Sequence, residues 1–413
     1  MNPNPPPSLR LLSIFDAAAT EQSFGGAAAR IHISQPAVTQ SIRRLEHWAV
    51  AELLRRNRHG CQPSEMGKIL YQRTRRLFAQ FEDALARPLI GPPFAEGDRI
   101  GYLARAITES QVQALAAIDA TGSIERAARS LGISPPSVQR AARGLEGLLK
   151  RALFKRTTQG SATTRSGAEL ARRLQLALRE RDYAQDELQL ARDESAVRLV
   201  VGVLPMSCTA VLAAALDRLV QEFPDIRLQV QESVYQELEP RLRAGKLDMI
   251  YGVLREATRA ADIEDRALFD DPYVAVVRPG HPLAGRPDLT RTDLADCAWI
   301  VPPVTSPRRQ LTDAAFGTAS REPPSMIETN SIATAKALLA ANDRVMLLAR
   351  YDAERESAQG QMAILDIRSG FCRAPTGLST LQGWQPTRLH RRFMTLMQLE
   401  AARAFDTESP APA

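Results

Sequence analysis

The sequence predicts an α+β protein of several domains, in which two all-α modules precede a long helix and an α/β region. Three observations support this. The chain has 413 residues, which is too long for one ordinary hydrophobic core. A segment of its first third recurs one hundred positions later without a gap. After Val197, short apolar runs alternate with amphipathic stretches, which is typical of an α/β domain.

The internal repeat aligns Phe15–Gly67 with Leu115–Gly167. Identical residues are spread over the whole match, at Ser23, Ala27, Ala28, Ile33, Ser34, Pro36, Val38, Leu45, Glu46, Leu53, Arg56, Gly60 and Gly67 and at the positions one hundred residues later. A gapless match of this kind indicates duplication of one module of roughly eighty residues with its trailing helix.

Each copy is expected to contain three short helices. The first helix of the first copy carries an apolar stripe at Leu12, Phe15 and Ala19. Ser23 starts the second helix, whose small residues permit close packing. After a turn at residues 31–33, Ser34 is placed to cap the third helix, and Pro36 falls in its first turn, where proline is tolerated.

The third helix separates an apolar face from a polar one. The apolar positions are Val38, Ile42 and Leu45 in the first copy, and Val138, Ala142 and Leu145 in the second. The outward residues are Gln35, Thr39, Gln40, Arg43 and Arg44, and then Gln139, Arg140 and Arg143 after a cap at Ser134. Gln, Thr and Arg are side chains that contact base edges and phosphates in the major groove of DNA. The alternative is that this polar side simply faces solvent. That alternative is weakened because the same layout occurs in both copies.

A small β-wing is expected beyond each third helix. Residues 53–60 and 153–160 both begin with an apolar pair, continue with basic residues and end at a glycine turn. The charge balance agrees with an anionic polymer as the partner of this region. Up to Arg165 the chain has 23 Lys and Arg against 13 Asp and Glu, whereas the remainder has 30 against 34. A solvated basic face would give the same imbalance.

The run from Ala27 to Glu46 resembles the recognition segment of LysR-type transcriptional regulators. The second copy diverges from it at Ser134–Val138, but its wing, Leu153–Gly167, is closer to the family pattern. Together, outward position and resemblance imply DNA contacts from Ser34, Gln35, Pro36, Thr39, Gln40, Arg43, Arg44, Arg56, Arg58, Ser134, Pro136, Gln139, Arg140, Arg143, Lys155 and Arg156.

The tandem arrangement departs from the family, which normally has one such module. We expect both modules to contact double-stranded promoter DNA and to give a footprint longer than one pair of half-sites. The competing hypothesis is that one copy has become an element for dimerisation or spacing.

Two long helices and a hinge are expected around the second module. A helix over about Met66 to Ala86 trails the first copy, and a long exposed helix from Ser166 to about Glu194 needs a partner. The resemblance implies that the second of these helices mediates dimerisation, and a plain connector is the alternative.

The expected domains are a first module with its trailing helix at 1–87, a hinge at 88–107, a second module at 108–165, a linker helix at 166–194, an effector domain at 195–405 and a disordered tail at 406–413.

The α/β region resembles the effector domain of the same family. Strands are expected at Val197–Leu204, Ile226–Gln231, Met249–Leu254 and Trp299–Val301, and helices at Thr209–Phe223, up to Ala244, and at Ile332–Ala340. The resemblance implies two α/β lobes similar to those of periplasmic solute-binding proteins, with a cleft between them. It places a crossover at Tyr273–Val277 and a return after about Gly360.

Polar residues where strands pass into helices are candidates for the cleft. They are Ser207, Cys208, Thr209, Thr305, Ser306, Asn330 and Ser331. Hydroxyl groups and free backbone N–H groups at such sites favour a carboxylate or another small anion. Simple helix capping is the alternative for each residue. Cys208 is expected at a helix N-terminus, which acidifies a thiol, so redox sensing is a minor alternative to a buried cysteine.

Other classes of protein are disfavoured. The four cysteines have no metal or disulfide spacing, and none of the five histidines has a nucleophile, a metal-ligand set or a phosphate loop around it, so we expect neither a cofactor nor enzyme activity. The N-terminus lacks a signal peptide, and Pro205 interrupts the uncharged stretch Leu199–Leu216, so we expect a cytoplasmic protein that does not contact membranes.

The function expected is that of a sequence-specific DNA-binding regulator controlled by a small anionic metabolite. It would act as a homodimer or homotetramer, with RNA polymerase as a candidate partner. A solute-binding protein without DNA readout, and a regulator in which only one module reads DNA, are the alternatives.

Overall fold

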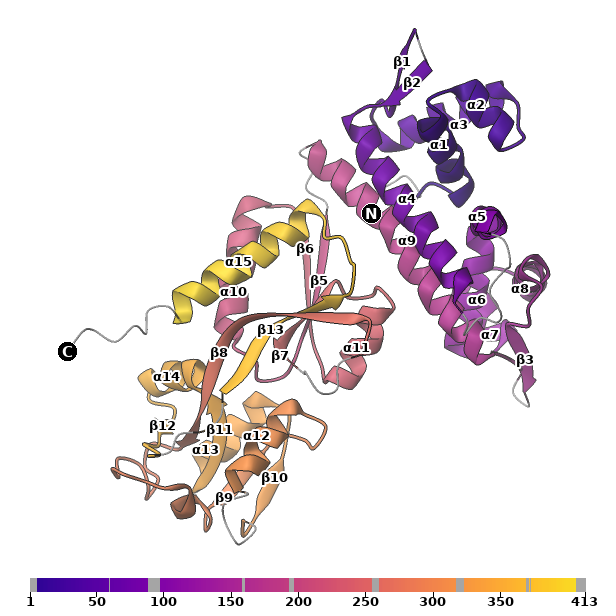
Figure 1. Ribbon diagram of the computed structural model, residues 1–413. Coiled ribbons are helices and arrows are strands. Elements are labelled where there is room, and N and C mark those ends of the chain that lie inside the picture. The colour runs from indigo at the N-terminus through magenta and orange to yellow at the C-terminus, as the bar shows by residue number, and fades with distance from the viewer. Residues whose placement is uncertain are drawn as a thin grey trace. The chain divides into compact units, whose positions relative to one another are not determined.

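The computed structural model describes residues 6–58, 60–87, 97–157, 160–192, 197–254, 260–316, 323–368, 371 and 373–405. The chain divides into two compact units, Met1–Ala196 and Val197–Ala413 (Figure 1). The tail expected to be disordered, 406–413, and the first part of the expected hinge, 88–96, lie outside the described residues.

The first unit opens with three helices, a two-stranded wing and a long helix. These are α1 (Leu9–Glu21), α2 (Phe24–Arg30), α3 (Gln35–Ala49), β1 (Leu54–Asn57), β2 (Gly60–Pro63) and α4 (Glu65–Ala86). Each of the four helices starts after a serine whose hydroxyl accepts a hydrogen bond from the backbone N–H three residues later, at Ser8, Ser23, Ser34 and Ser64. The helix start expected at Ser23 and the cap expected at Ser34 are therefore confirmed.

The same six elements recur in the second copy. They are α6 (Glu109–Thr121), α7 (Ile124–Leu131), α8 (Pro135–Leu149), β3 (Phe154–Thr157), β4 (Gly160–Thr163) and α9 (Arg165–Ala191). Each begins one hundred positions after its counterpart, so the sequence repeat is also a structural repeat. The expected apolar faces are confirmed in both copies, because Val38, Ile42, Leu45, Val138, Ala142 and Leu145 are all buried.

Two repeated details fix the wing to the helices. A carboxylate oxygen of Glu46 accepts hydrogen bonds from the N–H groups of Leu53 and Leu54 at 3.0 and 3.3 Å, and Glu146 makes the equivalent bonds at 2.8 and 3.1 Å. Gly67 has no room for a side chain, since a Cβ there would lie 2.0 Å from the carbonyl oxygen of Leu53. At the matching glycine of the second copy that distance is 2.2 Å. These contacts explain why glutamate and glycine recur in the repeat.

The hinge expected over 88–107 is in part a helix. Gly97–Ala106 form α5, which packs against α4 and buries Leu103. Arg105 on α5 is ion-paired with two carboxylates, those of Glu82 and Asp16, at 2.7 and 3.1 Å. The proline and glycine content of the segment concealed an apolar spacing that this packing stabilises.

The long helix expected to be exposed is largely covered. α9 packs along α4 of the same chain and also contacts α6. Its expected apolar positions are buried or half-buried in these contacts, at Leu170, Leu174, Leu178, Tyr183 and Leu188. The exposed-helix prediction is therefore wrong, because amphipathic spacing signals that a partner exists and does not say which segment provides it.

The second unit is a mixed sheet with helices. Its elements are β5 (Arg198–Val203), α10 (Thr209–Glu222), β6 (Arg227–Glu232), α11 (Tyr235–Arg243), β7 (Met249–Val253), β8 (Ile263–Val277), β9 (Ala298–Val301), α12 (Pro307–Phe316), β10 (Met326–Glu328), α13 (Ile332–Ala341), β11 (Arg344–Ala349), α14 (Arg350–Ala358), β12 (Ala363–Ile364), β13 (Arg373–Leu381) and α15 (Arg388–Phe405), with a 3₁₀ turn at Arg291–Leu294.

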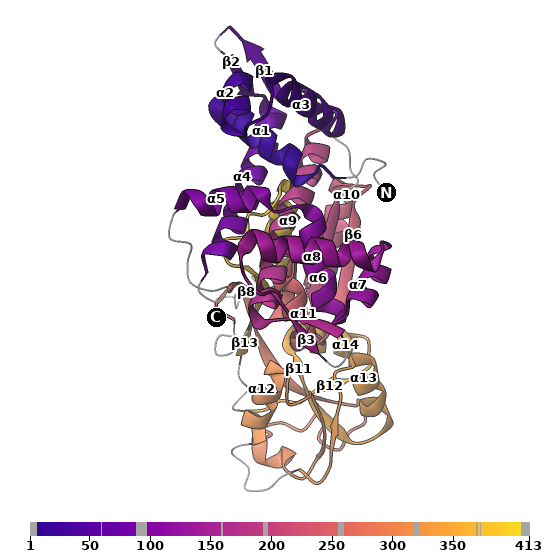
Figure 2. The ribbon, with the colours of Figure 1, turned by 90° about the vertical axis from the view of Figure 1, so that its right-hand side faces the viewer.

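Two lobes share this sheet (Figure 1), and Figure 2 shows the same structure turned by 90°. Parallel strands β5, β6 and β7 form one lobe, and parallel strands β9, β10 and β11 form the other. The antiparallel strands β8 and β13 join them. The crossover strand is longer than predicted, because β8 starts at Ile263 and Tyr273–Val277 already pair with β11 or β12 in the second lobe. The expected return is β13.

Candidate DNA-reading surface and effector pocket

The third helix of the first copy presents a continuous polar face. Val38, which is fully buried, anchors the opposite side against the core. Gln35, Pro36, Gln40, Arg43 and Arg44 are exposed, and Thr39 is half-buried beside them. The outward orientation expected for this helix is therefore present, and it results from the buried spacing of the apolar face.

The equivalent face of α8 is also exposed, with one difference at its start. Pro136, Gln139, Arg140 and Arg143 are exposed. Ser134 occupies the N-cap position, but its hydroxyl bonds the Ser137 hydroxyl at 2.9 Å and does not accept a backbone N–H, so the expected cap is wrong in this detail. Ser137, three residues later, offers a competing partner, whereas the first copy has Ala37 at that position.

The wings carry exposed cations in both copies. Arg56 and Arg58 are exposed on the first wing, and the Arg56 guanidinium lies 4.6 Å from the ring centroid of Phe24 at the start of α2. Lys155 and Arg156 are exposed on the second wing. The stacking on Phe24 holds one cation beside the helices, where a phosphate backbone would pass.

Several cations on these helices are free to bind an external anion. Within the described part of the chain, Arg43, Arg44, Arg140 and Arg143 form no ion pair with a carboxylate. The arginines that lie between α4 and α9, by contrast, are paired internally. Unpaired guanidinium groups on an exposed helix face provide charge for phosphates or guanine edges.

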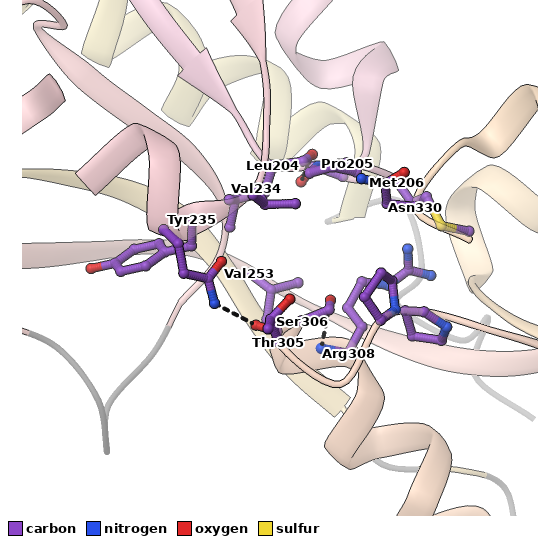
Figure 3. A pocket seen from close by; sticks show the side chains of 14 residues that line it. Leu204, Pro205, Met206, Val234, Tyr235, Val253, Thr305, Ser306, Arg308 and Asn330 are labelled. Atoms are coloured by element: carbon purple, nitrogen blue, oxygen red, sulfur yellow. Dashed lines mark hydrogen bonds between the residues drawn. The ribbon is translucent and has the colours of Figure 1, made fainter. Parts of the chain in front are cut away.

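A pocket in the second unit lies where strands of both lobes pass into helices (Figure 3). One side is formed by the segment after β5, the start of α11 and the end of β7. The other side is formed by the segment after β9, the start of α12 and Asn330. Four of the expected cleft residues line it, namely Ser207, Thr305, Ser306 and Asn330.

Three expected cleft residues are not in the lining. Thr209 is exposed as the first residue of α10, and Ser331 caps α13 by accepting a bond from Thr334. Cys208 holds the N-cap position of α10, as predicted, but burial raises the pKa of its thiol to about 12. The buried cysteine that the sequence favoured is therefore confirmed, and the minor alternative of an acidified thiol is not supported, because loss of solvent outweighs the helix terminus.

Arg308 is the charged residue of this pocket, and sequence reasoning missed it. It is 5% exposed and lies two residues after Ser306, on the first turn of α12. One guanidinium nitrogen donates to the carbonyl of Leu347 at 3.2 Å, and the group lies 5.3 Å from the ring centroid of Tyr273. Its Nε and Nη1 atoms have no hydrogen-bond partner among the described residues.

Burial also affects a carboxyl group close to Arg308. It raises the pKa of Asp352 to about 6, and the positive charge of Arg308 opposes part of that rise. Arg308 is a buried cation with two nitrogen donors that have no acceptor among the described residues, and hydroxyl and amide groups lie beside it. Such a group is suited to hold a small anion.

Comparison with known proteins gives matches over both units. The model for "Bacterial regulatory helix-turn-helix protein, lysR family" matches twice, at residues 9–68 and 110–168, and the "LysR substrate binding domain" model matches residues 192–402. The HTH-type transcriptional regulator GalR of Pseudomonas putida is 27% identical over 362 residues, which cover 87% of this chain and 89% of GalR.

Two further proteins are similar to this chain, one in sequence and one in fold. The HTH-type transcriptional regulator GbpR of Azospirillum brasilense is 28% identical, with 66% of this chain and 80% of GbpR covered. The solved structure of a full-length OxyR variant from Pseudomonas aeruginosa shares the fold with a TM-score of 0.54 at 18% identity, and the match covers 71% of this chain and 94% of that one.

The fold and these surfaces define a DNA-binding regulator with an effector-binding domain. The chain belongs to the LysR family of transcriptional regulators. No helix among the described residues is long and apolar enough to cross a membrane. The described residues also contain no cluster of three or more side chains suited to hold a metal ion.

Proposed function

We propose that both recognition helices of the chain read base edges in the major groove. Two exposed faces of the same layout support this, and the arginines on each face form no ion pair with a carboxylate of the described residues. Gln35 and Gln40 suit adenine edges, and Arg140 suits the acceptors of guanine. The cations of the wings would bind phosphates and make the affinity depend on salt.

Footprinting on the DNA upstream of the protein's own gene tests the proposed readers. We expect Gln40→Ala and Arg140→Ala each to change base preference at a different part of the footprint, by about 1–3 kcal/mol for each lost bidentate contact. Gln221→Ala is the control, because Gln221 is an exposed residue of the other unit whose side chain donates a hydrogen bond to Asp217 at 2.9 Å. A change of base preference for Gln40→Ala alone would show that the second module is not a reader.

The proposed effector is a small anion, with a carboxylate as the first choice. The observation that supports it is the buried Arg308 at a pocket lined by Thr305, Ser306 and Asn330, because its Nε and Nη1 atoms have no hydrogen-bond partner within the described part of the chain. The hydroxyl and amide groups would fix the orientation of the anion, and the guanidinium group would supply the charge.

Calorimetric titration of the full chain with succinate and benzoate, and with their neutral methyl esters, tests this site. We expect the carboxylates to bind and Arg308→Gln to weaken them about 10- to 100-fold, as expected for loss of a charged hydrogen bond. Arg309→Gln is the matched control, because Arg309 is already paired with Asp313 and Glu328. Equal binding of the esters and the carboxylates would exclude an anion site.

Regulation follows if the effector binds one arrangement of the protein more tightly than another. By linkage, the effector must then change DNA affinity by the factor by which DNA changes effector affinity. We further propose a homodimer or homotetramer that acts in the cytoplasm, without catalysis, and with RNA polymerase as a partner. The faces of α4 and α9 that pack against each other are covered within one chain, so chains would have to assemble through other surfaces.

A further inference from the structure

The two trailing helices of the repeat run antiparallel and are joined by side-chain pairs along their length. Arg73 pairs with Glu187 at 2.9 Å, Gln80 donates to Glu180 at 3.1 Å, and Asp83 pairs with Arg173 at 3.4 Å. As the position on α4 rises, the position of the partner on α9 falls. Figure 1 shows α4 and α9 side by side in this unit.

The pairing has the form of a two-fold axis. Residues one hundred positions apart are equivalent in the repeat, so Gln80 and Glu180 are the same position of the two copies, and they contact each other directly. Position 83 of the first copy meets position 173, and position 73 meets position 183, where the Arg73 guanidinium lies 5.5 Å from the ring centroid of Tyr183. In an isologous interface, residue i meets j and j meets i, as observed here.

The same axis relates the two reading modules. Each module is fastened to its own trailing helix by the same contacts, because a backbone carbonyl lies against Gly67 in one copy and against Gly167 in the other. The glutamates that hold the wings are equivalent as well. The modules therefore lie at the two ends of the α4–α9 pair, as Figure 1 shows.

We infer that one chain reads the two half-sites of an operator. Its first module, α1 to β2, which we call the first head, reads one half-site, and its second module, α6 to β4, which we call the second head, reads the other. This inference rests on the proposed DNA readout. The pair of α4 and α9 within one chain takes the place of an interface between two chains. The half-sites must be unequal, because the outward residues at equivalent positions differ: Gln35 and Pro135, Thr39 and Gln139, Gln40 and Arg140.

Cross-linking of the full chain tests whether the pair forms within one molecule. Asp83→Cys and Arg173→Cys place two thiols across the pair at an ion pair whose side chains are 55% and 19% exposed. With a short bis-maleimide, the double variant should give a cross-linked monomer, and an equimolar mixture of the two single variants should give no covalent dimer. The untreated and treated wild-type chains are the controls for the native cysteines. A covalent dimer from the mixture, or no cross-link in the double variant, would overturn the inference.

Scrambled half-sites test which head reads which sequence. The footprint of the wild-type chain defines two half-sites, and each is then scrambled in turn. Scrambling the half-site that the first head reads should lower the DNA affinity of the wild-type chain and of Arg140→Ala roughly tenfold or more. The same scrambling should have little further effect on the DNA affinity of Gln40→Ala. Scrambling the second should give the reverse pattern.

The outcomes separate this inference from the proposed function. If Gln40→Ala removes sensitivity to both half-sites and Arg140→Ala to neither, the first heads of two chains read the operator, so the inference fails while DNA readout stands. If the wild-type chain is insensitive to scrambling of any part of the duplex, the proposed DNA readout itself fails.

Discussion

Glu180 is the residue whose neutralisation tests the α4–α9 pair most sharply. Its side chain is 3% exposed, and its carboxylate accepts hydrogen bonds from Arg73 at 3.0 Å, Arg76 at 3.2 Å and Gln80 at 3.1 Å. The substitution Glu180→Gln keeps the shape and removes the charge. Arg73 then keeps the carboxylate of Glu187 as a partner, whereas Arg76 loses its pair with the Glu180 carboxylate.

The expected loss follows from this geometry. Removing one partner of a buried ion pair costs about 3–5 kcal/mol. We expect the lower end, about 3 kcal/mol, because Glu187 still neutralises Arg73 and because Arg76 is 29% exposed and is partly hydrated. A loss of that size corresponds to an opening equilibrium shifted by about a hundredfold.

Amide hydrogen exchange measured by mass spectrometry reports this opening locally. Protection of α4 and α9 should fall by about a hundredfold, and α10 in the other unit should keep its protection. Glu65→Gln is the control, because the Glu65–Lys68 pair is exposed and its loss should not be measurable in the same assay. If Glu180→Gln changes the exchange of α4 and α9 no more than this control does, the reasoning about the buried cluster is wrong.

Three further predictions concern other parts of the chain. Gly67→Ala should lower the free energy of unfolding by more than about 3 kcal/mol in urea denaturation, since the new methyl group would overlap the Leu53 carbonyl, whereas Gly147→Ala, which meets nothing, should be tolerated. Glu46→Ala should release the wing and weaken DNA binding in a gel-shift titration by about tenfold. Because the pKa of Asp352 is raised to about 6, the neutral carboxyl favours the folded state, and the stability that it contributes at low pH is lost as the pH rises from about 4 to about 6. Asp352→Asn should therefore gain up to about 3 kcal/mol of unfolding free energy relative to wild type across that range, measured by paired urea titrations.

The two helix-turn-helix modules could be predicted from the sequence because their signals are local. Serine caps, the apolar spacing of Val38 and Ile42, and the proline in the first turn each act within a few residues. The repeat also supplied a second, independent reading of the same pattern. Only the cap at Ser134 differed, and there the competing partner was another hydroxyl in the same turn.

The remaining features depend on contacts between distant segments. An amphipathic α9 signals a buried face, but its partner α4 begins one hundred residues earlier in the chain. The segment 97–106 is helical because α4 covers it, which its glycine and proline content concealed. Arg308 could not be assigned to the cleft from its neighbours alone, because its orientation depends on how β8, β11 and α12 pack around it. Its position two residues after the expected Thr305–Ser306 pair was the one available signal.

The affinity of the full chain for its own upstream DNA, compared with a scrambled duplex of the same length at the same salt concentration, tests the central claim most directly. Two outward recognition helices predict a preference of at least about a thousandfold for the specific duplex. Equal affinity for the two duplexes would mean that these helices contact phosphates only, and the account of the protein as a reader of sequence would be wrong.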